Sequence, residues 1–318
     1  MSGYQRKSQL ARKASHAGSW YNDDPRQLDA QLSGWMAQAS VARRPSRAII
    51  SPHAGYDYSG HVAAHAFNQI VPDSVKRIFI LGPSHYLHLA GKCSLATVTQ
   101  YSTPFYELPI DQAGRDHFFF YYTYLLKVYT ELKRTGEFDQ LSIDRDEEEH
   151  SIEMQLPYIA KVMERQRGSF AIVPVLVGLL SLEREATYGR ILAPYLVDPG
   201  NIFVISSDFC HWGHRFQYTH YNPEKGEIWQ SIKWLDEQGM QLIEDLNADA
   251  FNAYLKQCGN TICGQHPIGI LLQMTSILRH KHHVNRMDFK FVKYAQSERC
   301  RNMNQSSVSY AAGSLQIL

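Results

Sequence analysis

Short runs of β-branched and apolar residues alternate along the chain with segments whose apolar residues recur at helical spacing. A run that is apolar on both faces is typical of a strand in the centre of a sheet. Two runs near the end of the chain instead alternate apolar and polar residues, as half-buried strands do. The predicted strands are RAII (47–50), VKRIFIL (75–81), FAIVPVLVG (170–178), NIFVIS (201–206), MDFKFVKYAQ (287–296) and SSVSYAAGSLQIL (306–318).

Helices are predicted between these strands, and Pro157 predicts a kink within one of them. Strands interleaved with helices, without a Gly/Ser/Pro-rich linker or a change in composition, indicate one α/β domain. We expect a single-domain layered sandwich with a mixed, mainly parallel central sheet. The predicted helices cover residues 25–39, 151–165, 234–246 and 267–278.

Two segments fall outside this pattern. Residues 1–13 are basic and lack the apolar core of a secretory signal, so we interpret them as an N-terminal extension of a single domain over residues 14–318. Residues 113–127 are dense in aromatic side chains and show no clear period. They are either a real insertion, packed on the surface or in an oligomer contact, or an artefact of the gene model.

Composition narrows the class of protein. The 318 residues carry a formal net charge of +1, which gives no electrostatic reason to expect nucleic acid or a membrane surface as partner. The five cysteines are an odd number without a CxxC pair, which fits a reducing compartment. The longest uncharged apolar stretch, residues 118–126, is too short to span a bilayer. We therefore expect a cytoplasmic protein without a membrane span, with the nucleus as a second compartment.

Polar groups that can bind a metal follow three of the predicted strands. His53 comes after the first strand, His85 after the second, and Asp208 and His211 after the strand at 201–206. Parallel strands share one carboxyl edge of a sheet, and ligand sites form outside that edge. Each residue alone is typical of an ordinary loop, but three corresponding positions together predict a site. No glycine-rich nucleotide cradle or GxSxG elbow offers an alternative site.

Further candidates lie in two other segments. Cys263 precedes the helix predicted at 267–278, where the positive end of the helix dipole would lower the pKa of its thiol; the alternative is a buried small hydrophobe. His266 lies near the start of the same helix. His150 and Glu153 are spaced to share one helix face, although a solvated acidic turn with a cap explains them equally well.

The motifs together closely resemble the Memo family, over nearly the whole chain from about Ala14 onward. Residues 113–127 depart from the family pattern. The resemblance implies a fold like that of the class III extradiol ring-cleaving dioxygenases. The motifs are ASHAGSWY (14–21), RAIISPHAGYDYSG (47–60), RIFILGPSHY (77–86), EHSIEMQLPY (149–158), PVLVGLLS (174–181), SSDFCHWG (206–213), NTICGQHPIG (260–269) and YAQSERCRN with SSVSYAAG (294–313).

The resemblance also implies a function. It makes His53, His85 and Cys263 the metal-binding residues of a pocket, with Asp208 and His211 beside them and Trp20 at its vestibule. It implies a signalling adaptor that binds phosphotyrosine-containing receptor peptides in this pocket and handles copper. Such a protein relays receptor tyrosine kinase signals to the actin and microtubule cytoskeleton and to cell migration, with cytoskeletal or Rho-type signalling proteins as partners and a role in redox signalling.

The ligand chemistry leaves an enzymatic alternative open. Two histidines and a soft thiolate favour Cu(I), or Zn²⁺, over the Fe(II) of a dioxygenase, so binding is favoured over ring cleavage. Protonated histidines offer a route to phosphate, and Trp20 offers an aromatic face for the phosphotyrosine ring. The alternative is a copper- or iron-dependent oxidase or dioxygenase, with His211 as general base and Asp208 setting its tautomer. A third hypothesis is a scaffold whose pocket is vestigial.

Overall fold

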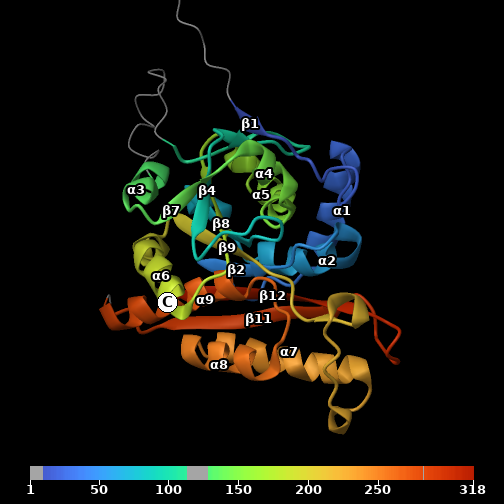
Figure 1. Cartoon of the computed structure of the whole chain (residues 1–318). Coiled ribbons are helices and arrows are strands. Elements are labelled where there is room, and N and C mark those ends of the chain that lie inside the picture. The colour runs from blue at the N-terminus through green and yellow to red at the C-terminus, as the bar shows by residue number, and fades with distance from the viewer. Residues whose placement is uncertain (1–9, 113–127, 282) are drawn as a thin grey trace, which may run out of the picture.

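Four parallel strands form the centre of the main sheet in the computed structural model, which describes residues 10–112, 128–281 and 283–318 (Figure 1). All four are almost entirely buried, which explains their continuous apolar sequences. Three of them, adjacent in the sheet, carry the loops that form the candidate site. In sheet order the four strands are β2 (Ala48–Ser51), β9 (Asn201–Ser206), β3 (Arg77–Pro83) and β8 (Ala171–Val177).

Strands of both directions extend the sheet on its two sides. On one side, β4 (Cys93–Ala96) pairs with β8 in the antiparallel direction. Beyond it, β7 (Phe138–Leu141) pairs with β4 in the parallel direction. On the other side, β12 (Ser307–Ile317) is antiparallel to β2. Both β11 (Met287–Gln296) and β10 (His211–Trp212) pair with β12. The sheet of nine described strands is therefore mixed with a parallel centre, and the predicted fold class is confirmed.

Helices cover both faces of this sheet (Figure 1). The crossovers from β2 to β3 and from β8 to β9 run in opposite directions along the sheet, so their right-handed connections place α2 and α6 on opposite faces. Around α2 (Tyr56–Phe67) pack α1 (Pro25–Gln38) and α5 (Leu156–Val162). The other layer contains α6 (Leu182–Val197), α9 (Gln265–Lys281), α7 (Ile228–Glu244) and α8 (Ala248–Cys258).

A small second sheet holds the start of the described chain. Strand β1 (Ala11–Arg12) pairs with β5 (Gln100–Tyr101), which pairs with β6 (Leu108–Pro109). The N-terminal extension predicted for residues 1–13 thus includes two residues that form a strand of the fold. Near it, α3 (Val128–Arg134) and α4 (Ile143–Glu148) complete the described helices. The predicted insertion at residues 113–127 lies outside the described residues.

The helix predicted over residues 151–165 is wrong as one helix. Residues 153–155 form a 3₁₀ turn, α5 follows, and residues 164–166 form another 3₁₀ turn. Pro157 lies in the first turn of α5, where a missing N–H leaves no hydrogen bond unmade, so it starts this helix rather than kinking it. The segment that precedes α5 is therefore irregular, and it carries His150 into the site.

Candidate metal centre

Three histidines meet beyond the carboxyl ends of the parallel strands. His53 follows β2, His85 follows β3, and His150 comes from the segment between α4 and α5. One potential ligand atom of each lies within 4.8 Å of the others. The rings of His85 and His150 stack with centroids 4.5 Å apart, and the ring of His53 stands edge-on to both. The strands predicted to share an edge therefore bring His53 and His85 together, and tertiary folding adds His150.

The hydrogen bonds around His53 fix the tautomer of its ring. Its Nδ1 atom lies 2.8 Å from Ser206 Oγ, and this hydroxyl donates to the carbonyl of Ser151 at 2.7 Å. Because the hydroxyl hydrogen is used there, Ser206 must accept from His53, which places the proton on Nδ1. The Nε2 atom of His53 then carries a lone pair, on the side where the sulfur of Cys263 lies 3.2 Å away. A metal ligand is commonly oriented by such an outer hydrogen bond.

Glu149 orients His85 in the same way. Its carboxylate accepts from the backbone N–H of His85 at 2.6 Å, and the Nδ1 atom of His85 lies 2.9 Å from its other oxygen. The N–H groups of His150 and Ser151 also donate to Glu149. Burial opposes the charge of this carboxylate, but the hydrogen bond from His85 and the neighbouring histidines lower the pKa of Glu149 to about 2. A carboxylate–histidine pair thus leaves Nε2 of His85 free.

His150 forms the wall between the pocket and the N-terminal segment. The ring of Trp20 packs on it at a centroid distance of 4.5 Å, and the exposed Tyr86 stands edge-on to it at 5.9 Å. Its Nδ1 atom is buried without a hydrogen bond, because Glu149 Oε1 lies 3.4 Å away in an unsuitable direction. A buried nitrogen without a partner is costly. This orphaned atom is an observation in favour of a ligand at the site.

Cys263 contacts His53 rather than all three histidines. Its Sγ atom lies 3.2 Å from Nε2 of His53 and accepts from the backbone N–H of Asp208 at 3.2 Å. Among the described residues it is not part of the group whose ligand atoms all lie within 4.8 Å. Burial and the Asp208 carboxylate raise the pKa of the thiol well above its usual range, so the pKa lowering expected from the helix dipole is wrong.

Asp208 and His211 lie at the same sheet edge but do not pair with each other. The Asp208 carboxylate accepts from the backbone N–H of His53 at 2.9 Å, which fixes the turn after β2. The Nδ1 atom of His211 lies 2.9 Å from the carbonyl oxygen of Phe209 and 3.2 Å from that of Thr261. These carbonyls place the proton on Nδ1. The tautomer of His211 is therefore set by backbone oxygens, not by Asp208 as the enzymatic alternative expected.

Two further candidates are engaged elsewhere. Glu153 accepts from Arg12 at 2.6 Å, from Tyr21 at 2.9 Å and from the backbone of His16 at 2.8 Å. Its carboxylate thus stands behind the pocket wall. The Nδ1 atom of His266 lies 2.7 Å from Oε1 of Glu185 on α6, a pair between α9 and α6. In these contacts, Glu153 and His266 connect neighbouring segments of the fold.

Two histidines of the site, His53 and His150, have lowered pKa values that favour the neutral form. Burial, reinforced by His85 and His150, lowers the pKa of His53 well below its usual value. Burial and His85 lower the pKa of His150 to about 3. Neutral imidazoles are the form that binds metals, whereas protonated imidazoles would attract phosphate. The protonated-histidine route to phosphate is therefore unavailable to these two residues near neutral pH.

The donors available fit a soft or borderline metal ion. His53 and His85 would each offer an Nε2 atom, and either the thiol of Cys263 or the ring of His150 would supply the third ligand. Imidazole and thiolate together suit copper and zinc, whereas a non-haem iron site needs a carboxylate. Glu149 and Asp208 are both occupied by hydrogen bonds to His85 and His53. The residues fit copper or zinc better than iron.

Sequence reasoning missed the residues that orient the ligands. Glu149 was part of an acidic run, and Ser206 ended a strand, so neither stood out by residue type. The deeply buried Arg12 was assigned to a basic extension. An available signal was the run of glutamates directly before His150, since a carboxylate is one of the groups that orient metal-binding histidines. The structure directs Glu149 to the ring of His85 instead.

Known proteins resemble this chain over nearly its full length. The Memo-like protein family matches residues 12–314. Protein MEMO1 of Xenopus laevis is 53% identical over 306 residues, which covers 96% of this chain and 97% of that protein. Protein MEMO1 of Homo sapiens is 52% identical over 308 residues, or 97% and 98% of the two chains. Protein memo-1 homolog of Caenorhabditis elegans is 48% identical over 309 residues, 96% of this chain and 82% of that protein.

The length and apolar character of the described helices bear on whether one of them can span a membrane. Throughout the described ranges, none is both long enough and apolar enough to cross a bilayer. Helix α7, one of the two longest, is amphipathic and packs against β11. The prediction of no membrane span holds for this part of the chain.

Proposed function

The chain belongs to the Memo-like protein family, and from this membership and the geometry of its pocket we propose that it is a signalling protein that binds copper. In this proposal the protein relays receptor tyrosine kinase signals to the actin and microtubule cytoskeleton through cytoskeletal or Rho-type partners. The observation that supports the metal site most is the pair of Nε2 atoms on His53 and His85, each ring being oriented by a hydrogen bond on its opposite nitrogen.

His53 and His85 would hold the ion, with Cys263 as the third ligand and His150 as its competitor for that place. Bound copper would supply a centre that accepts soft ligands and one electron. Neighbouring residues would hold these ligands in place. Ser206 and Glu149 hold the two rings, and Asp208 holds the backbone of His53 and the sulfur of Cys263 through its own N–H.

Copper binding is tested on protein purified without air. The parent should bind Cu(I) stoichiometrically in competition with a chromophoric chelator. His53→Gln and His85→Gln should each weaken binding by more than the roughly 10- to 100-fold that loss of an outer-shell partner costs. His214→Gln is the matched control, because His214 is exposed on a neighbouring loop. Equal affinity in all four proteins would rule out this site.

The same pocket is proposed to receive a phosphotyrosine-containing receptor peptide. Support comes from the aromatic side chains around it: Trp20 is partly exposed against His150, and Tyr86 is exposed beside it. An aromatic face of this kind accommodates a tyrosine ring. Trp20→Ala should weaken a phosphotyrosine peptide by about tenfold or more in fluorescence anisotropy. Trp229→Ala, on the distant α7, is the partly buried control.

The difference in affinity between the phosphorylated and the unphosphorylated peptide tests whether the pocket recognises the phosphate group. The proposal expects the unphosphorylated peptide to bind at least about tenfold more weakly than the phosphorylated one. Equal affinity for the two peptides, or equal affinity of the Trp20 and Trp229 variants, would contradict peptide binding in this pocket. Neither result would affect the copper proposal.

A metal-dependent oxidase or dioxygenase with a role in redox signalling is the second candidate. One observation favours it: His211 presents a free Nε2 atom near the site, as a general base requires. The engagement of Glu149 and Asp208 with histidines speaks against an iron centre. Oxygen uptake by the copper-loaded protein with catechol-like reductants, lost in His211→Gln, would favour this candidate over a binding protein.

A further inference from the structure

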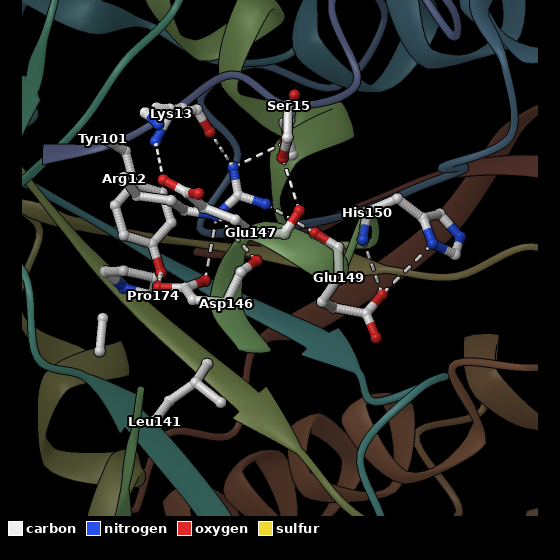
Figure 2. A network of polar contacts seen from close by, with 12 residues as sticks. Arg12, Lys13, Ser15, Tyr101, Leu141, Asp146, Glu147, Glu149, His150 and Pro174 are labelled. Atoms are coloured by element: carbon white, nitrogen blue, oxygen red, sulfur yellow. Dashed lines mark hydrogen bonds and ion pairs between the residues drawn. The ribbon is translucent and has the colours of Figure 1, made fainter. Parts of the chain in front are cut away.

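A buried arginine ties the N-terminal strand to the segment that carries Glu149 and His150 (Figure 2). Arg12 is fully buried, and its guanidinium reaches the Asp146 carboxylate at 3.1 Å and the Glu153 carboxylate at 2.6 Å. Tyr101 donates to the same Asp146 carboxylate at 2.6 Å. The N-terminal segment, here residues 11–16, therefore contacts the pocket wall from behind.

The guanidinium also binds backbone oxygens. Its Nε atom donates to the Asp146 carbonyl at 2.9 Å and its Nη2 atom to the Glu149 carbonyl at 2.7 Å. These oxygens lie at the C-terminal end of α4, where a helix leaves its last carbonyls without partners. Ser15 adds a hydrogen bond to the Glu147 carbonyl at 2.5 Å. The N-terminal segment thus binds two carbonyls at the end of α4 and the carbonyl of its C-cap residue, Glu149.

Stability alone gives a weak reason for this arrangement. A buried ion pair pays a large desolvation cost and often contributes little net stability, although it can specify one conformation. Here the conformation specified is that of Glu149, whose carbonyl binds Arg12 and whose carboxylate binds His85. His150 is the next residue, and its backbone N–H binds that carboxylate as well.

We infer that Arg12 is a positioning residue for the metal site, acting through the Glu149 backbone on His85 and His150. This inference rests on the proposed metal site. It assigns to the N-terminal segment a role in metal affinity, although none of residues 11–15 is a candidate ligand. A purely structural role would instead lower stability and leave the geometry of the histidines unchanged.

Arg12→Lys is the informative variant. Lysine keeps a positive charge between Asp146 and Glu153 but lacks the planar fork that also reaches the two carbonyls. The expected result is a folded protein whose affinity for Cu(I) is about tenfold weaker, the loss typical of an outer-shell partner. Arg184→Lys is the matched control, because Arg184 also binds one carbonyl, of Gly91, and one carboxylate, of Glu137, away from the pocket.

A second readout does not depend on the metal. Two-bond ¹H–¹⁵N spectra of the histidine rings in the metal-free protein report the tautomer of His85, whose Nδ1–H donates to Glu149. Arg12→Lys should change these His85 signals, and Arg184→Lys should leave them as in the parent. If the parent binds no copper, the proposed function fails, and the ring spectra still decide the inference.

The inference can be overturned with Arg12→Lys or, if that protein does not fold, with Ser15→Ala. Unchanged copper affinity and unchanged His85 signals in a folded Arg12→Lys protein would overturn the inference while leaving the metal site intact. Should Arg12→Lys not fold, Ser15→Ala takes its place, because Ser15 is exposed and its loss removes only the bonds to the Glu147 carbonyl and Glu153. It should weaken copper severalfold, and parent-like affinity would overturn the inference.

Discussion

The Nε2 atom of His53 lies 3.2 Å from the Sγ atom of Cys263, although 210 positions separate the two residues in the chain. His53 follows β2, and Cys263 lies two residues before the start of α9. Because Ser206 holds the proton of His53 on Nδ1, the lone pair of Nε2 faces the thiol. A metal ion at this point would replace the thiol proton.

Cys263→Ser tests that contact. We expect the affinity for Cu(I) to fall by more than about 100-fold, beyond the cost of losing an outer-shell partner, since the hydroxyl is a poor ligand for a soft ion. Because the pKa of the thiol is raised, binding releases a proton, and the affinity of the parent should increase with pH. Chelator competition at several pH values measures both effects.

Two controls accompany this variant. Cys258→Ser changes another partly buried cysteine and should leave the affinity as in the parent. His150→Gln identifies the third ligand: a loss larger than that in Cys263→Ser would assign the place to His150. Parent-like binding by Cys263→Ser, with the same pH dependence, would exclude the thiol from the site.

Ser206→Ala should weaken the metal site without touching a ligand. The substitution removes the acceptor of His53 Nδ1–H and the donor to the Ser151 carbonyl, so both buried groups lose a partner. We expect copper affinity to fall about 10- to 100-fold. The free energy of unfolding should fall by about 1–3 kcal/mol in urea titrations. Ser314→Ala, on a buried serine of β12 that bonds to the Arg43 carbonyl and to Ser46 instead of the site, is the control for affinity; equal losses in the two variants would contradict the role of Ser206.

Gly264→Ala should displace Cys263. A Cβ atom at this position would lie 2.6 Å from the Ser206 carbonyl oxygen and would also collide with the side chain of Ser207. We expect a cost of about 1–3 kcal/mol in the free energy of unfolding, as for other overpacked sites, together with weaker copper binding. Gly34→Ala has open space around it in α1 and should stabilise the protein by about 0.5–1 kcal/mol. Parent-like stability of Gly264→Ala would show that the neighbouring loops yield.

Stability should depend on pH through Glu153. Burial opposes its charge, but hydrogen bonds from His16 and the charge of Arg12 prevail and lower its pKa from 4.5 to about 2. The unfolded state therefore binds more protons between these two values, and the stabilisation present above pH 4.5 is lost as the pH falls toward 2. The shift corresponds to about 3 kcal/mol.

Asp146 acts in the opposite direction and in a different window. Burial outweighs its bonds to Arg12 and raises its pKa from 3.8 to about 6, so its contribution to stability increases as the pH falls between these values. Urea titrations between about pH 6 and about pH 3 measure the sum of both effects. Glu153→Gln should flatten the loss below pH 4.5, and an unchanged slope there would contradict the assignment.

Much of the sheet was predictable because local sequence and burial agree. The runs at 75–81, 170–178 and 201–206 are apolar on both faces, and they became β3, β8 and β9 in the parallel centre. Five of the described α-helices were not predicted: α3, α4 and α8, and the longer α2 and α6, which cover the sheet. The last two show why. Their sequences include glycines that larger side chains pack against, such as Gly60 under Trp35, so no clear apolar stripe marks them.

The sequence by itself determined the family, the fold class and the strand-end positions of His53, His85 and Asp208, because short-range patterns specify strands and parallel strands share one edge. Only the tertiary structure decided which groups orient them. Ser206, Glu149 and Arg12 contact residues up to 153 positions away in the chain, and the sequence does not show which partners they meet. Folding also decided the pKa directions, since burial and the charges brought near each group control them.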